Sequence, residues 1–548
     1  MSTRISAELT GRRPSIVRAI TLKPHKRLLA LGIVVLALCL LAPASAFAQG
    51  EASPAANPDF AAIDAYIQKE MSELHIPGMT YGIVHDDKVV HLESFGEADP
   101  SGRDVTSQTP FILASTSKSF TALAIMQLSE EGKVDLDAPV QRYVPWFRVA
   151  DKAASNRITV RDLLNHTSGL PEDTSFEPMR SDDMSDDALE ERVRTLSDVK
   201  LNHPDGAAFE YTDANYDVLG LIVQRVAGQS YESYVQEHIF APLDMSHSFT
   251  NQTAAQRHGL ATGHRSWFSF PASFEAPYSR GATPSSYLVS STQDMTHYLI
   301  AQLNAGRYGD ESVLSPKGVA AMHRPAVKEG DRDIFYGMGW ERRSTPSGVP
   351  VIQHDGTNSN FYADMVLEPE GRWGVVILAN FNSFNLNGGR LQGLSSGVIS
   401  QLHGQAPPDV PMPHHPIFAS AMLLVAVVSV LQLLGMVRSV VLLRRWRTQP
   451  HRRPRRRWVV ALRVGVPLVL NVGWGLFMLI GYPSLLYPLS ATLLLVPDLG
   501  YLVVVSGVVA LSWGILRTVL TYLALRQRGA PKVTETPVPE ASKVSVEA

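Results

Sequence analysis

A serine and a lysine that stand three positions apart, Ser115 and Lys118, are the residues of this sequence best suited to covalent chemistry. On a helix this spacing is nearly one turn, so the two side chains would lie on one face with Cβ atoms about 5–6 Å apart. A serine hydroxyl becomes a good nucleophile only when a neighbour accepts its proton. A lysine can accept it only if burial or nearby charge brings its pKa down from about 10.4 toward neutrality.

The segment after this pair predicts the burial that Lys118 would need. The run Phe120–Leu128 is uncharged and mostly apolar, and Gly132 is suited to end the helix. A helix that is apolar on most sides is a buried one. Its N-terminus would also direct backbone N–H groups at the Ser115 oxygen, the arrangement that holds an oxyanion.

The serine–lysine pattern is weak by itself, because the chain contains it twice. Residues 197–200 (Ser-Asp-Val-Lys) have the same spacing without an apolar helix after them, so Lys200 would stay solvated and charged. A rival nucleophile, Ser395, stands in residues 393–397 (Gly-Leu-Ser-Ser-Gly), which fit the G-x-S-x-G elbow of α/β-hydrolases. That elbow needs an Asp and a His after its serine. The chain between Ser395 and the apolar C-terminal region is too short to build these partners, since it offers only His403, Asp409, His414 and His415. We therefore expect Ser115 to be the nucleophile.

The elements around the pair predict a layered α+β domain. Pro58 is suited to the first turn of a helix over Phe60–Leu74, in which apolar residues recur at helical spacing. Two strand-like runs, Met79–His85 and Val89–Phe95, follow and form a hairpin. A helix, an antiparallel hairpin and then a buried helix favour an antiparallel sheet flanked by helices over a doubly wound sheet.

Further motifs stand in a fixed order on both sides of the serine–lysine pair. Ile76-Pro77-Gly78 precedes the pair, and Ile158–Pro171, Phe209–Tyr216, Pro242–Met245, Tyr336–Trp340 and His354-Asp355-Gly356 follow it. With these motifs the chain resembles the serine β-lactamase and penicillin-binding-protein superfamily, in its class C β-lactamase-like branch, over about residues 60–402. The resemblance implies an antiparallel sheet flanked by helices, an all-helical subdomain, and a covalent acyl-enzyme on the serine of an S-x-x-K motif.

The resemblance also implies roles for Tyr211 and Asp213. Tyr211 stands where the family keeps the tyrosine of its Y-x-N motif. A phenol with a pKa near 10 serves as a base only as a phenolate beside a cation, which Lys118 would supply. Asp213 stands where the family usually has Asn. If ionised, it would pair with Lys118, hold it charged and favour proton removal by Tyr211. It would also lack the amide donor that could bind a substrate carbonyl.

The same resemblance places the other side of the site at residues 354–357. Gly356 would let a substrate backbone approach an edge strand, and the N–H of Thr357 would be the second oxyanion donor beside that of Ser115. His354-Asp355-Gly356 stands where the family places K-T-G or H-x-G. With His354 in place of lysine, this position is expected to titrate near neutrality, so carboxylate-bearing substrates would be held less firmly at alkaline pH. His166 is expected to organise a turn and to have no chemical role.

The N-terminus predicts export. Residues 1–48 contain basic residues, then the uncharged run Leu28–Ala42, then an A-x-A site at 46–48, as in a cleaved signal peptide. The alternative is that this segment is not cleaved and anchors the protein in the membrane. Cys39, the only cysteine, lies in this run, so cleavage would leave no disulfide and no thiolate metal ligand. Residues 49–415 hold 27 basic and 47 acidic residues, a balance that argues against nucleic-acid binding.

The C-terminal region predicts three membrane spans. Residues 417–437, 464–482 and 499–516 are uncharged stretches of about the length that crosses a bilayer. The nine arginines of the loop 438–457 would place this loop, and with it the C-terminus, in the cytoplasm. The preceding domain would then lie outside the membrane, and residues 483–497 would form an interfacial or re-entrant connection.

These features predict an organisation in six parts. They are a signal peptide (1–48), a linker (49–58), a β-lactamase-like domain (59–404), a linker (405–416), a three-helix transmembrane region (417–528) and a disordered tail (529–548). We expect a multi-pass cell-membrane protein with an extracytoplasmic serine hydrolase domain and no cofactor or metal. The resemblance implies cell-wall-type D-amino-acid peptides, including peptidoglycan-derived ones, β-lactams or small esters and amides as substrates. The alternative is a slowly deacylating penicillin-binding sensor or envelope interaction protein that signals through its transmembrane helices.

Overall fold

The computed structural model of the 548-residue chain describes residues 58–176, 181–268, 270–383, 388–409, 416–454, 456–485 and 488–526. The expected signal peptide, nearly all of the first linker and the expected C-terminal tail lie outside the described residues.

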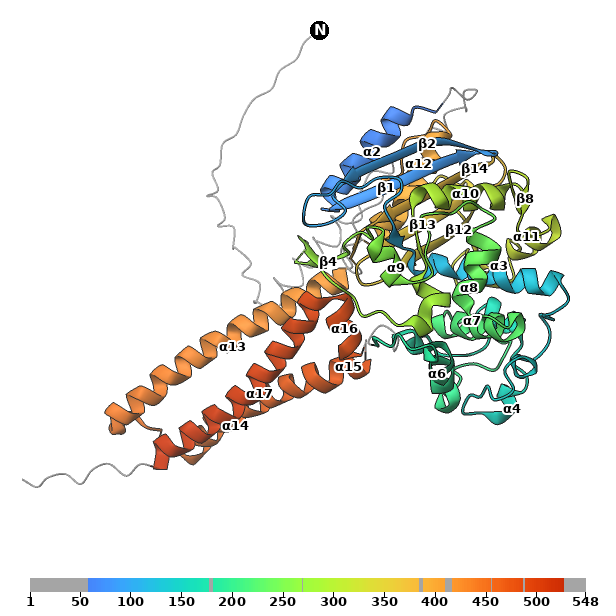
Figure 1. Cartoon of the computed structure of the whole chain (residues 1–548). Coiled ribbons are helices and arrows are strands. Elements are labelled where there is room, and N and C mark those ends of the chain that lie inside the picture. Colours follow the sequence, from blue (N-terminus) through green and yellow to red (C-terminus); the bar gives the residue numbers. More distant parts are fainter. Residues whose placement is uncertain are drawn as a thin grey trace, which may run out of the picture. The chain divides into compact units, whose positions relative to one another are not determined.

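An antiparallel sheet of eight strands forms the centre of the domain (Figure 1). Its order is β2-β1-β14-β13-β12-β11-β10-β9, so the N-terminal hairpin lies beside strands from the end of the domain. The strands are β1 (Gly78–His85), β2 (Lys88–Gly96), β9 (Val327–Lys328), β10 (Phe335–Tyr336), β11 (Glu341–Ser344), β12 (Pro350–Thr357), β13 (Tyr362–Glu368) and β14 (Trp373–Ala379). The hairpin predicted from the sequence is confirmed.

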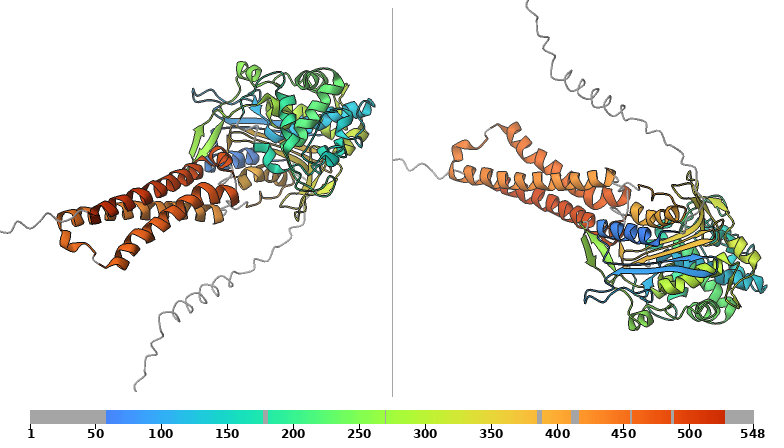
Figure 2. Two further views of the ribbon diagram at one scale, coloured as in Figure 1. Left: turned by 90° about the horizontal axis from the view of Figure 1, so that it is seen from below. Right: turned by 90° about the horizontal axis from the view of Figure 1, so that it is seen from above.

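Helices cover both faces of the sheet because the strands alternate their apolar side chains. In β14, Val375 and Ile377 face one core, whereas Val376 and Leu378 face the other. Helices α2 (Phe60–Glu73) and α12 (Gly388–Leu402) lie together over the first face, as Figure 2 shows. On the other face, α10 (Thr292–Leu303) packs against β14 and β1, and α3 (Ser117–Glu130) contributes Phe120 to the same core. This layering confirms the α+β fold.

A helical region is inserted between α3 and the later strands. It comprises α4 (Lys152–Ser155), α5 (Val160–Leu164), α6 (Ala188–Arg194), α7 (Asp213–Ala227), α8 (Tyr231–Val235) and α9 (Gln252–Arg257). Helix α7 is buried along its first three turns and packs against α3. This contact brings the start of α7 to the start of α3. The described part of the inserted region is predominantly helical, as expected.

The helix that carries Lys118 has the predicted length and burial. Helix α3 ends at Glu130, and Gly132 follows with φ +73°, a conformation that suits glycine. Pro58 is not the first helical residue of α2, because Asp59 caps that helix by accepting a hydrogen bond from the Ala62 N–H at 3.1 Å.

Within the described residues, three helices of the C-terminal region are long and apolar enough to cross a membrane. They are α13 (Pro416–Thr448), α14 (Arg457–Leu476) with its continuation to Leu485, and α17 (Pro497–Arg526). The short helix α16 (Leu489–Leu495) precedes α17. Residues 438–448, expected as part of a loop, are instead the end of α13. Arginine is a good helix former, so charge alone does not end the helix.

Candidate active site

Ser115 lies at a strained turn that joins a strand to α3. It belongs to the short 3₁₀ helix η1 (Ala114–Thr116), which runs directly into α3. Ala114, just before it, has φ +46°, a left-handed conformation that costs a non-glycine residue about 1–2 kcal/mol. A distant segment of the chain stabilises the turn, because the Leu113 N–H donates a hydrogen bond to the Leu288 carbonyl at 2.8 Å. The position of the serine is therefore fixed before any ligand binds.

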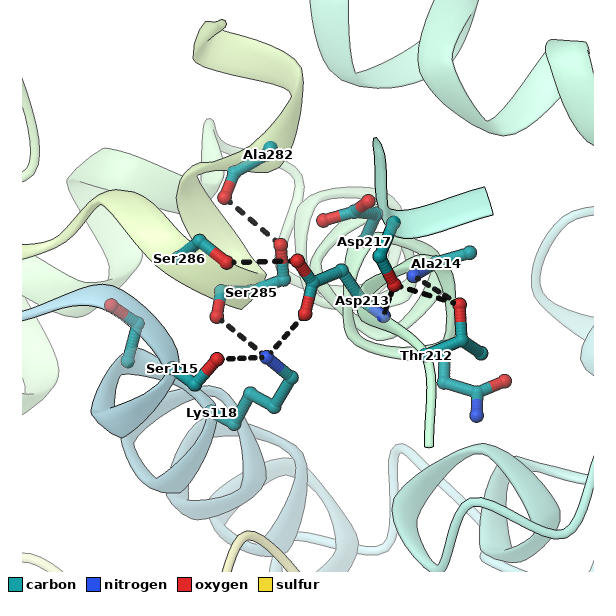
Figure 3. Close-up of polar contacts among 12 residues, drawn as sticks. Ser115, Lys118, Thr212, Asp213, Ala214, Asp217, Ala282, Ser285 and Ser286 are labelled. Carbon is teal, nitrogen blue, oxygen red and sulfur yellow. Dashed lines mark hydrogen bonds and ion pairs between the residues drawn. The ribbon is translucent and has the colours of Figure 1, made fainter. Parts of the chain in front are cut away.

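Lys118 is fully buried and donates all three of its N–H groups (Figure 3). Its Nζ lies 3.0 Å from Ser115 Oγ, as the three-residue spacing predicts. The same nitrogen lies 2.6 Å from Asp213 Oδ1 and 3.0 Å from the Ser285 carbonyl oxygen. An ammonium group has three donors, so these three acceptors satisfy it completely.

Asp213 supplies the negative charge next to Lys118. It is the first residue of α7, where the helix dipole favours a carboxylate, and its backbone N–H donates to Ser175 Oγ at 2.9 Å. Its second oxygen, Oδ2, accepts a hydrogen bond from Ser286 Oγ at 3.2 Å. The ion pair expected between Asp213 and Lys118 is thus present. Both carboxylate oxygens have protein partners, so direct substrate binding by Asp213 stays a prediction.

Tyr211 lies beside the pair but keeps its proton. Lys118 Nζ lies 4.9 Å from the centre of the Tyr211 ring. Burial and the Asp213 carboxylate raise the pKa of the Tyr211 phenol well above its usual range, although a hydrogen bond to Ser115 lowers it. A resting phenolate, as expected from the sequence, is therefore disfavoured. The main physical reason is the burial of the phenol, and the Asp213 carboxylate adds to it.

His166 packs against the Tyr211 ring, in line with the structural role expected for it. Its ring lies 4.4 Å from the Tyr211 ring, and its Nδ1 accepts a hydrogen bond from the Thr212 backbone N–H at 3.2 Å. It is completely buried, and desolvation holds its pKa well below the usual range, with a smaller effect from Lys118. The neutral ring fixes the direction of the Tyr211-Thr212-Asp213 segment.

His354 differs from the titratable group expected from the sequence. Its side chain is buried, and desolvation followed by the Lys118 charge lowers its pKa to about 3. Nδ1 lies 2.7 Å from the Asp355 carbonyl oxygen, so it must be the donor, and Nε2 accepts from the Tyr336 hydroxyl at 3.1 Å. Both ring nitrogens are therefore occupied by protein groups. His354 is neutral at physiological pH and has no free donor for a substrate carboxylate.

Gly356 allows β12 to pass directly against η1. A Cβ atom at this position would lie 2.2 Å from the Leu113 carbonyl oxygen and 3.0 Å from the Ser115 nitrogen. Strand β12 is internal in the sheet, but β11 pairs only with its residues 350–353, whereas β13 pairs as far as Thr357. Residues 354–357 therefore have one strand edge without a β partner, next to Ser115. This is where an oxyanion site between the Ser115 and Thr357 N–H groups was predicted.

Sequence reasoning missed Ser285 and Ser286. They belong to the helical turn η8 (Thr283–Tyr287), which packs against α3 and α7. Ser285 acts through its backbone carbonyl, which any residue could provide, so the sequence carried no signal for it. The two sequence alternatives fall outside the site. Lys200 is exposed, and Ser395 is buried within α12, where its hydroxyl donates to Asp364 at 2.5 Å.

Among the described residues, one cluster of three side chains has the spacing of a metal site, and it lies between α2 and β2. It consists of Asp64, His91 and Glu93. Asp64 Oδ1 already accepts a hydrogen bond from the Tyr81 hydroxyl at 2.5 Å and lies 2.8 Å from His91 Nε2. Hydrogen bonds within the protein thus occupy Asp64 and His91, and the cluster lies apart from Ser115 and Lys118.

Comparisons with known proteins identify the family to which this fold belongs. The profile of the Beta-lactamase family matches residues 63–392. Protein flp of Staphylococcus aureus (strain MW2) is 33% identical over 323 residues, which cover 59% of this chain and 63% of flp. Penicillin-binding protein 4 of Amycolatopsis lactamdurans is 28% identical over 359 residues, which cover 62% of this chain and 91% of that protein. The chain thus matches less than two thirds of the length of flp.

Solved structures show the same fold. The octameric penicillin-binding protein homologue from Pyrococcus abyssi superposes with a TM-score of 0.57 at 27% identity, covering 65% of this chain and 79% of that one. A mutant class C beta-lactamase superposes with a TM-score of 0.51 at 23% identity, covering 59% and 92%. The second likeness concerns the fold alone. Because the family profile spans more than half of the sequence, the chain belongs to the beta-lactamase family.

Proposed function

We propose that this protein is a serine hydrolase that forms a covalent acyl-enzyme on Ser115. The observation that carries the proposal is the 3.0 Å contact between Ser115 Oγ and the fully buried Lys118 Nζ. In the acylation step, Ser115 Oγ forms a bond to the acyl carbon and the bond to the leaving group breaks. The Ser115 proton passes to the Tyr211 oxygen, with which Ser115 shares a hydrogen bond, while the Tyr211 hydroxyl gives its own proton to the leaving group. The N–H groups of Ser115 and Thr357 would stabilise the oxyanion.

Acylation should be slow, because Lys118 Nζ already donates to three acceptors and offers no lone pair to the Ser115 proton. The ion pair with Asp213 holds Lys118 in this arrangement. The Tyr211 phenol is protonated and is suited to pass a proton to the leaving group. We therefore infer that the Lys118–Asp213 pair sets the rate at which Ser115 reacts.

Both ring nitrogens of His354 are hydrogen-bonded to protein groups. This favours acyl donors that carry no carboxylate near His354. Among the substrates considered from the sequence, small esters and amides without a free carboxylate fit better than β-lactams or peptides with a free carboxylate. A cell-wall-type D-amino acid would fit where its carboxyl group is the one that is esterified or amidated. The neutral His354 is the specific observation that favours this class.

We also infer that the three apolar helices cross the cell membrane and tether the hydrolase domain outside the cytoplasm. Arginine gathers near the end of α13 and the start of α14, the region that the positive-inside rule places in the cytoplasm. The hydrolase domain and the start of α13 would then both lie on the extracytoplasmic side of the membrane.

Labelling of the full-length chain tests the proposed chemistry. A fluorophosphonate probe and a fluorescent penicillin should each be compared on the parent, on Ser115→Ala and on the control Ser395→Ala. We expect fluorophosphonate labelling that Ser115→Ala abolishes and Ser395→Ala leaves unchanged. Rapid loss of an acyl label supports the hydrolase, and a persistent label supports the sensor alternative. Absence of labelling by both probes in a folded chain would exclude a covalent function for Ser115.

A further inference from the structure

The hairpin formed by β4 (His264–Trp267) and β5 (Phe270–Ser273) exposes three aromatic side chains at its tip. Trp267, Phe268 and Phe270 are 38%, 49% and 64% exposed. In the described part of residues 58–409, the other large apolar side chains with comparable exposure are Val89, Val90 and Met184. The exposed aromatic rings of the hydrolase domain, as far as it is described, are thus gathered on one hairpin.

The geometry of the hairpin presents these rings as one group. Trp267 and Phe270 are directly paired across the two strands, so their side chains lie on the same face. Phe268 follows Trp267 in the turn, and its ring lies edge-on to the Trp267 ring at 5.4 Å. A group of exposed aromatic rings on an otherwise polar surface marks a contact site for an apolar partner.

The hairpin tip lies beside the start of α17. The Trp267 ring is 5.6 Å from the Tyr501 ring, and the Phe268 N–H donates to Asp498 Oδ2 at 3.3 Å. The Arg265 guanidinium also donates to the Leu494 carbonyl at 3.4 Å. The tip of the hairpin therefore lies next to the first turns of α17, the third apolar helix.

The order of the helices along the chain identifies which end of the bundle this is. Helix α13 leaves the hydrolase domain, α14 returns, and α17 leaves again, so α17 begins on the same side of a membrane as the domain. Tyr501, near that end, is 51% exposed. Tyrosine and tryptophan prefer the boundary between lipid and water, where the ring is in contact with acyl chains and the polar group with water.

We propose that Trp267, Phe268 and Phe270 insert into the headgroup region of the same bilayer that holds α13, α14 and α17. The inference rests on the proposed membrane insertion of these helices and is independent of the acyl-transfer chemistry. Residues 275–287, which follow the hairpin, lead to Ser285 and Ser286 at the Lys118–Asp213 pair. The membrane contact would therefore hold the wall of the active site close to the lipid surface.

The test uses the full-length chain in liposomes, with Cys39 replaced by serine and a single cysteine labelled with a fluorophore. The probes sit at Phe268→Cys and, separately, at Phe270→Cys, and the lipid carries a quencher near its headgroup. Met184→Cys, 41% exposed in the hydrolase domain, is the control outside the membrane, and Leu431→Cys, 61% exposed on α13, is the control inside it.

We expect quenching at positions 268 and 270 to be at least twice that at position 184. If position 431 is quenched and position 268 is not, the spans are inserted but the hairpin is not, which overturns this inference alone. A blue-shifted label at 268 that lipid does not quench would mean that α17 or a second copy covers the tip, which overturns it equally. If position 431 is not quenched, the membrane proposal itself fails and this inference fails with it.

Discussion

Replacing Asp213 with asparagine should accelerate the reaction of Ser115. The substitution keeps an acceptor oxygen at the position 2.6 Å from Lys118 Nζ but removes its charge. Two unit charges about 3–4 Å apart at an effective dielectric constant of about 20 attract by roughly 4–5 kcal/mol. Lys118 is fully buried, so water cannot replace the lost counter-charge. Proton transfer from Ser115 to Lys118, which the ion pair opposes, should therefore become easier.

The assay is the rate of fluorophosphonate labelling of the full-length chain from pH 6 to 9. Each 1.4 kcal/mol recovered in the barrier is a tenfold increase in rate, and recovery of a third of the Coulomb energy suffices for that. We expect Asp213→Asn to label at least ten times faster than the parent at pH 7.

Asp217→Asn is the matched control. Asp217 lies one turn further along α7, is 1% exposed, and forms an ion pair with Arg192 at 3.0 Å. Its replacement also removes a buried charge from the same helix, but it leaves the Lys118–Asp213 pair in place. This variant should lose stability without the increase in labelling rate. An unchanged or slower labelling rate in folded Asp213→Asn would refute the view that the ion pair restrains Lys118.

Three further predictions follow from the site. Lys118→Ala should abolish labelling of Ser115 while the chain is still produced and inserted, as measured by in-gel fluorescence and membrane fractionation; retained labelling would contradict its role. Gly356→Ala should reduce labelling at least a hundredfold, because the added Cβ would lie 2.2 Å from a carbonyl of the turn before Ser115; thermal unfolding separates this effect from loss of the fold. His354 has a folded pKa of about 3, below the unfolded value of about 6.5, so its stabilisation is complete above pH 6.5 and is lost as pH falls toward 3. At pH 5 this loss is about 2 kcal/mol, and a thermal melt that His354→Gln makes less sensitive to pH between 5 and 7 would verify it.

Local patterns in the sequence were sufficient for the layered fold and the central pair. The hairpin and α3 follow from the alternation and helical spacing of apolar residues, which act within one element. The contact between Ser115 and Lys118 follows from a spacing of three on one helical turn. The apolar length of three segments was enough to predict the C-terminal helices, although the end of α13 was placed too early.

The features that decide reactivity were not accessible from the sequence. The occupied His354 depends on Tyr336, which lies on another strand, and on complete burial that only the assembled domain produces. The left-handed Ala114 depends on tertiary hydrogen bonds, since alanine itself gives no such preference. The protonated state of Tyr211 depends mainly on burial, which only the assembled domain produces, and then on the Asp213 carboxylate.

The three acceptors around Lys118 make Ser115 a reporter of the folded state. Asp213 and Ser285 come from segments about a hundred residues or more from Lys118 along the chain, so the complete set exists only when all three segments are assembled. In a denatured chain Ser115 is an ordinary hydroxyl and Lys118 an ordinary solvated amine. The fraction of chains that react with an activity probe would thus measure the folded population directly in intact membranes, without purification or detergent.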